Sequence, residues 1–206
     1  DLIIGAPNDD PNGDASGASF VVFGKATGTA VELSAIEAGT GGFVINGVAR
    51  GDTSGYSVSS AGDVNGDGFD DLIVGARNDD PNGGSNSGAS FVVFGKASGA
   101  SVELSEIQLG DNEDGFVING VAAFDKSGTS VSSAGDVNGD GFDDLIIGAP
   151  NDDPNGDASG ASFVVFGKAS GASVELSEIE LDSNEDGFVI NGVSRDDKSG
   201  YSVSSA

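Results

Sequence analysis

Residues 54–77 read SGYSVSSAGDVNGDGFDDLIVGAR. A run of small and β-branched residues, SVSSA, comes first, an acidic loop follows, and an apolar run, DLIVGA, comes near the end. Short runs rich in β-branched residues and bounded by Gly, Asn and Asp are typical of β-strands. The stretch therefore predicts two strands joined by a loop of oxygen-bearing side chains.

The same pattern recurs along the chain, so the protein is an array of internal repeats. The DLII-type run begins at Asp1, Asp71 and Asp144, and the FVVFGK and FVINGV runs recur at a similar spacing. Each period holds four strand-like runs: SVSSA, DLIIG, SFVVFG and GFVING. The small residues of the first run suit a crowded innermost strand, and the unbroken apolar second and third runs suit strands covered on both faces.

Four antiparallel strands per repeat are typical of a β-propeller blade. The alternative, a calcium-binding β-solenoid, has a Gly-rich nonapeptide repeat that this sequence lacks. We therefore predict an all-β fold of four-stranded antiparallel propeller blades, with the acidic loop between the first and second strands. The expected boundaries are a partial blade over 1–50 (strands two to four), whole blades over 51–123 and 124–196, and the first strand of a further blade over 197–206.

Three periods fall short of the roughly four to eight blades that close a propeller. We expect that the chain does not close a ring alone: it belongs to a longer array, or residues 201–206 complete the open blade of a second copy. The VELSEIQL stretch at residues 102–109 fits either one helical turn capped by Ser105 or an extended segment.

The acidic loop has the ligand pattern of a calcium site. Oxygen-bearing side chains stand at loop positions one, three, five and nine, and a Gly at position six permits the sharp turn. Three carboxylates held together without a cation would repel one another, and oxygen ligands without sulfur or imidazole favour Ca²⁺. An EF-hand would need a Glu at position twelve, where this chain has Val74 and Ile147. A metal-free Asn-Gly hairpin turn is the other alternative.

Residues 54–77 resemble an FG-GAP repeat, and the resemblance covers the whole chain in three periods. That family builds the seven-bladed propeller of integrin α-subunits and occurs in many bacterial surface proteins. The resemblance departs from the family at the Phe of its name-giving Phe-Gly, which is Ser54, Ser127 and Ser199 here. The near-identical units with Asn-Gly-rich turns look more like bacterial repeats than an integrin. The calcium ligands that the resemblance implies are Asp63, Asn65, Asp67, the Phe69 carbonyl and Asp71, then Asp136, Asn138, Asp140, the Phe142 carbonyl and Asp144, with Asp1 as a ninth-position ligand.

Composition excludes several classes of function. The 34 acidic and 8 basic residues give a formal net charge of −26, which argues against nucleic acid and anionic membranes as partners. The sequence has no Cys and no His, so a thiolate nucleophile, an imidazole base and a His-based zinc site are impossible. No apolar run approaches the roughly 20 residues of a membrane span. Every acidic cluster is repeated in a turn or loop, so we expect no enzyme.

We therefore expect a calcium-binding propeller repeat outside the cell, secreted or at the cell surface, with a structural or adhesive role. The alternative is a self-assembling surface fibre or layer. The expected partners are calcium and other protein chains or further repeats of the same chain. The tripeptide Arg50-Gly51-Asp52 is expected to be incidental, because Asp52 is one copy of a repeated turn residue. Whether the Asn-Asp-Asp-Pro-Asn-Gly loops that begin at residues 8, 78 and 151 bind a second cation stays open.

Overall fold

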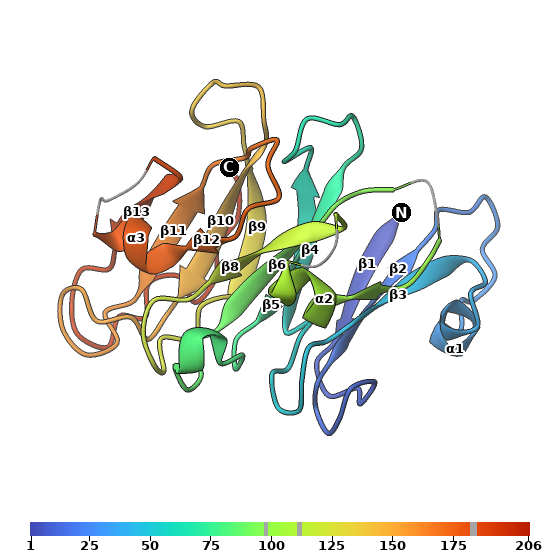
Figure 1. Ribbon diagram of the computed structural model, residues 1–206, viewed down its shortest axis with the longest axis horizontal. Coiled ribbons are helices and arrows are strands. Elements are labelled where there is room, and N and C mark those ends of the chain that lie inside the picture. Colours follow the sequence, from blue (N-terminus) through green and yellow to red (C-terminus); the bar gives the residue numbers. More distant parts are fainter. Residues whose placement is uncertain (97–98, 111–112, 182–184) are drawn as a thin grey trace.

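The computed structural model describes residues 1–96, 99–110, 113–181 and 185–206. Three β-sheets stand side by side along the long axis, with the N-terminal sheet at one end and the C-terminal sheet at the other (Figure 1). The sheets are largely antiparallel and the helices are short, so the predicted all-β fold of propeller-like blades is confirmed. None of the helices in these ranges is long and apolar enough to span a membrane.

Each sheet is assembled from strands of one repeat, and two of the sheets also take a short strand from the next repeat. In spatial order, sheet 1 contains β1 (Leu2–Ala6), β2 (Ala18–Val22), β3 (Gly42–Asn46) and β7 (Val102–Glu103). Sheet 2 contains β4 (Ser57–Gly62), β5 (Asp71–Ala76), β6 (Ala89–Val93), β8 (Gly115–Asn119) and β12 (Val174–Glu175). Sheet 3 contains β9 (Ser130–Gly135), β10 (Asp144–Ala149), β11 (Ala161–Val165) and β13 (Gly187–Asn191).

The two short strands, β7 and β12, are an addition to the predicted antiparallel blade. They pair in parallel with the outermost strand of the preceding repeat, β7 with β3 and β12 with β8. A short helix follows each of them directly, because the chain turns at the sheet edge. The helices of the described chain are α1 (Leu33–Glu37), α2 (Leu104–Leu109), α3 (Leu176–Glu180) and the 3₁₀ turn η1 (Pro81–Gly83).

The ambiguous stretch at residues 102–109 is thus both extended and helical. The cap at Ser105, part of the helical alternative, is wrong: the N-cap is Glu103, which has extended backbone angles and makes no side-chain cap hydrogen bond. Strand β7 holds Glu103 extended against β3, so the helix begins at Leu104 and Ser105 lies inside it. Leu104 and Ile107 are buried, and this apolar face, not a cap, fixes the helix against the sheets.

Two apolar cores hold the three sheets together. One core joins sheet 1 to sheet 2, with Phe43 and Ile45 packed among Val74 and Phe91. The other joins sheet 2 to sheet 3. The inner strands β4 and β9 lie close together. The second strand β5 also approaches the neighbouring repeat closely at Gly75. A Cβ added at Gly75 would lie 2.1 Å from the carbonyl oxygen of Gly128.

Residues 201–206 do not form a β-strand within residues 1–206. The equivalent strands β4 and β9 each pair with the DLII-type strand that follows them, β5 and β10. The segment instead lies beside β9, where the Val203 N–H donates to Ser130 Oγ at 3.0 Å. Within residues 1–206, the predicted first strand of a further blade is therefore not paired as β4 and β9 are.

Candidate metal-binding loops

Strands β4 and β5 position the first acidic loop between them. The pairing of these strands shifts register between Ser60 and Gly62, just before the loop begins. Asp71, the last loop residue, opens β5 and is fully buried. Its two carboxylate oxygens accept hydrogen bonds from the N–H groups of Gly95, at 2.8 Å, and Val64, at 3.0 Å. Backbone N–H groups from two separate segments therefore fix the carboxylate at the ninth loop position.

The first half of the loop folds around the carboxylate of Asp63. This carboxylate accepts the N–H groups of Gly66 at 2.8 Å, Asp67 at 3.0 Å and Gly68 at 3.0 Å. Asn65 Oδ1 also accepts the Asp67 N–H, at 2.8 Å. The loop backbone thus wraps around its own oxygen-bearing side chains and turns them inward, as a cation cage requires.

The second loop repeats this arrangement. The carboxylate of Asp136 accepts N–H groups from Gly139 at 2.7 Å and Gly141 at 3.0 Å. Asp144 is fully buried and accepts the Gly167 N–H at 2.9 Å. Asp1, the ninth-position residue of the first repeat, keeps the corresponding hydrogen bond from the Gly24 N–H at 2.7 Å.

The remaining predicted ligands of the two loops also make hydrogen bonds within their own loop. Asp67 accepts the Phe69 N–H at 2.8 Å, and Asp140 accepts the Phe142 N–H at 2.9 Å. The side-chain amide of Asn138 donates to Asp140 Oδ2 at 2.8 Å. All predicted ligands of each loop therefore belong to one hydrogen-bonded turn, and their role as metal ligands stays a prediction.

The pKa values of the buried loop carboxylates are raised, as expected for acidic groups that a bound cation would stabilise in their charged form. Burial raises the pKa of Asp71 to about 6, and the nearby charges of Asp67 and Asp63 add to the rise. Burial likewise raises the pKa of Asp144, with a smaller contribution from Asp140. A cation would favour the charged carboxylates and offset this cost. In the described ranges, no three Asp or Glu side chains are arranged to hold a metal ion by themselves, so the Asn and backbone oxygens would have to complete the cage.

The two loops also touch each other, which sequence reasoning missed. Asp143 Oδ2 accepts the Asp63 N–H at 2.9 Å, and the Asp143 N–H donates to the Asp63 carbonyl at 3.1 Å. The only signal in the sequence was an acidic residue repeated at loop position eight, Asp70 and Asp143. Through this contact, the start of one loop is coupled to the end of the next.

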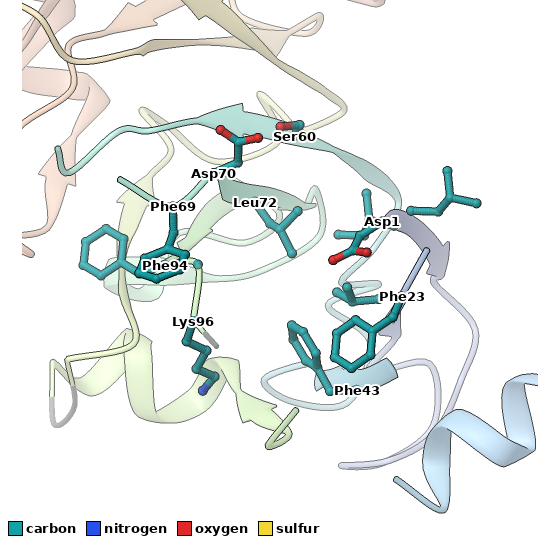
Figure 2. A pocket seen from close by; sticks show the side chains of 13 residues that line it. Asp1, Phe23, Phe43, Ser60, Phe69, Asp70, Leu72, Phe94 and Lys96 are labelled. Atoms are coloured by element: carbon teal, nitrogen blue, oxygen red, sulfur yellow. The ribbon is translucent and has the colours of Figure 1, made fainter. Parts of the chain in front are cut away.

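A cavity of about 590 Å³ lies between sheets 1 and 2, close to the first loop (Figure 2). Asp1, Phe69 and Gly95 are among the residues that line it. At the junction of sheets 2 and 3, Gly167 stands at the position equivalent to Gly95. There the carbonyl of Val64, a fully buried loop residue, lies close to Gly167. The cavity is therefore the space that a loop residue equivalent to Val64 would fill, and it belongs to the packing of the repeats.

The tripeptide at residues 50–52 is not arranged for recognition. Asp52 is buried and its Oδ2 accepts the Ala49 N–H at 2.8 Å, the turn contact expected from the repeats. Asp125 makes the same contact with the Ala122 N–H at 2.8 Å. Burial and the nearby charge of Asp79 raise the pKa of Asp52 to about 7.

Comparison with known proteins agrees with this geometry. The family model described as FG-GAP repeat matches residues 54–93 and 127–165, which include both loops. The chain is 32% identical over 141 residues to Integrin alpha-PS2 of Drosophila melanogaster and 29% identical over 175 residues to Integrin alpha ina-1 of Caenorhabditis elegans. These matches cover 66% and 77% of this chain but only 9% and 15% of the relatives' lengths.

Proposed function

Because this chain belongs to the FG-GAP repeat family and is integrin-α-like, we propose that it is a calcium-binding β-propeller module with a structural or adhesive role outside the cell. The observation that carries the calcium assignment is the pair of matching loops. In each of them a buried Asp ends the loop, and the carboxylate of the first Asp accepts backbone N–H groups of the turn. The proposed blades are residues 51–123 and 124–196, with 1–50 and 197–206 as parts of further blades.

The proposed ligands are, in the first loop, Asp63, Asn65, Asp67, the Phe69 carbonyl and Asp71, and the corresponding residues of the second loop. Bound Ca²⁺ would supply positive charge between carboxylates that otherwise repel, and so would clip β4 to β5 and β9 to β10. Asp1 is the proposed ninth-position ligand of one further loop.

The proposed location follows from calcium availability. Extracellular calcium modules bind the ion weakly, at roughly 10⁻⁴ to 10⁻³ M. Loops of this affinity would be empty at the low calcium concentration of a cytosol and filled outside the cell. We propose that the module is not an enzyme and that its partners are calcium and other protein chains.

Calcium-dependent stability tests the proposal. At ten times the dissociation constant, each site stabilises the folded chain by roughly 1.4 kcal/mol. We expect the melting temperature to rise by several degrees on addition of calcium and to fall on addition of a chelator. The double variant Asp67→Ala with Asp140→Ala should lose most of this response, because it removes one carboxylate from each loop.

The matched control is Glu106→Ala with Glu178→Ala. It removes the same number of charges from equivalent exposed residues of α2 and α3, outside all acidic loops. This control should keep the full calcium response. A wild-type melting curve that does not change between calcium and chelator would refute the calcium assignment.

A second candidate function is a self-assembling fibre or layer. The observation that favours it is the near-identity of the repeats, because a recognition face usually needs repeats that differ. Under this alternative the same calcium response is expected, but the binding partner would be the protein itself.

A further inference from the structure

The two acidic loops meet at a bridge between Asp63 and Asp143. The N–H of Asp63, the first proposed ligand of the first loop, donates to Asp143 Oδ2 at 2.9 Å. The N–H of Asp143 returns a hydrogen bond to the Asp63 carbonyl at 3.1 Å. Asp143 stands at position eight of the second loop, between two of its proposed ligands, and is not itself one of them. One of its carboxylate oxygens therefore holds the start of the other loop.

Two glycines of the first loop region make room for this bridge. A Cβ added at Gly62 would lie 2.2 Å from Asp143 Oδ2, and a Cβ added at Gly66 would lie 2.6 Å from the ring of Phe142. Both glycines also have a φ of +77°, a backbone conformation that favours Gly. The end of the second loop thus lies directly against the start of the first.

A second connection joins the buried ends of the two loops. Val64 of the first loop is fully buried, and its N–H donates to Asp71 Oδ2 at 3.0 Å. Its carbonyl oxygen would lie 2.9 Å from a Cβ added at Gly167. The Gly167 N–H in turn donates to Asp144 Oδ1 at 2.9 Å. Only Val64 and Gly167 therefore separate the two buried ninth-position ligands along this path.

We propose that the two loops bind calcium cooperatively, and that Asp143 of the second loop is a positioning residue for the first. This inference rests on the proposed function, because it requires that both loops hold the ion. A cation in either loop fixes residues that the bridge shares with the other loop, so the second ion finds part of its cage already ordered. Coupling between two sites is reciprocal, so each loop raises the calcium affinity of the other by the same factor, about fivefold or more.

Calcium titration calorimetry of the full 206-residue chain measures this coupling. Asp140→Ala disables the second loop and Asp67→Ala the first, so each variant gives the affinity of one loop alone. We expect the wild type to bind two ions with an overall constant at least about fivefold above the product of the two single-loop constants. Repulsion between the ions opposes the coupling, so the titration uses about 0.15 M salt, which screens surface charges beyond about 8 Å.

The outcomes of this titration separate the two proposals. An overall constant equal to the product of the single-loop constants would overturn the cooperativity and leave the calcium assignment intact. A wild type that binds no calcium would overturn both.

The bridge itself is tested in the Asp140→Ala background, in which only the first loop binds. There, Asp143→Ala should weaken calcium binding at least about fivefold, although Asp143 lies outside the binding loop. Asp143→Asn keeps a side-chain oxygen for the Asp63 N–H and should retain most of the affinity. Equal affinities of the Ala and Asn variants would contradict the positioning role.

The reverse direction is tested in the Asp67→Ala background, in which only the second loop binds and its own residues are unchanged. Gly66→Ala should weaken calcium binding at least about fivefold, because the added Cβ displaces Phe142, which carries a proposed carbonyl ligand. The matched control is Gly68→Ala in the same loop. Gly68 also has a positive φ, but its added Cβ meets no atom of the described residues within 4 Å, so the affinity should stay unchanged. Equal effects of the two substitutions would overturn the coupling between the loops.

Discussion

At the scale of single residues, the acids that lie buried between neighbouring repeats have strongly raised pKa values. Asp52 and Asp125 stand at equivalent turns, and each lies near an acid of the following loop, Asp79 and Asp152. Burial, followed by these like charges, raises the pKa of Asp52 and of Asp125 to about 7. The sequence predicted the turn contact of Asp52 from its repetition. It could not predict the burial, because the neighbouring repeat provides it.

These raised pKa values predict that the chain is less stable at high pH. A carboxyl group whose pKa is higher in the folded state binds protons more tightly there, so its contribution to stability is complete below about pH 4 and is lost as the pH rises toward 7. In the presence of a chelator, we expect the free energy of unfolding to fall between about pH 4 and pH 7, by at most about 1.4 kcal/mol per pH unit for each group. Urea titrations at several pH values measure this slope.

The variant Asp52→Asn with Asp125→Asn should flatten that slope and be more stable than the wild type at pH 8. An Asn at either turn still offers a side-chain oxygen to the N–H of Ala49 or Ala122, so the turn contact is kept. If the slope of the variant equals that of the wild type, the buried acids are not responsible for it.

At the scale of elements, close approach between the inner segments fixes which residues can occupy them. Gly75 of β5 would clash with the Gly128 carbonyl if it carried a Cβ. We expect Gly75→Ala to destabilise the chain by about 1–3 kcal/mol, because backbone and not a flexible side chain would have to move. The control Gly28→Ala changes a residue with no other atom within 4 Å of the added Cβ and should be nearly neutral. Urea unfolding compares the two, and equal effects would contradict the argument.

The strands could be predicted because each one is a local run of small, β-branched or apolar residues with clear boundaries. The short strands β7 and β12 could not, because their partners β3 and β8 belong to the preceding repeat and two residues carry no periodicity. The same cause misplaced the helix cap at Ser105. The loop residues were predicted from their spacing, whereas the contact of Asp63 with Asp143 depends on how neighbouring repeats stack.

At the scale of the whole molecule, the place of a repeat in the array decides what each residue contributes. Phe116 and Phe188 have the same identity and the same strand position, but Phe116 is buried between sheets 2 and 3 while Phe188 lies on the open C-terminal face. In a linear array each interface adds its own energy, so equivalent residues stabilise only where a neighbouring repeat is present.

We therefore expect Phe116→Ala to cost about 3–5 kcal/mol, as for a large core side chain, and Phe188→Ala to cost less than about 1 kcal/mol in dilute solution. The measurement is urea unfolding at a protein concentration where sedimentation shows monomers. An equal cost at both positions would contradict the additive array.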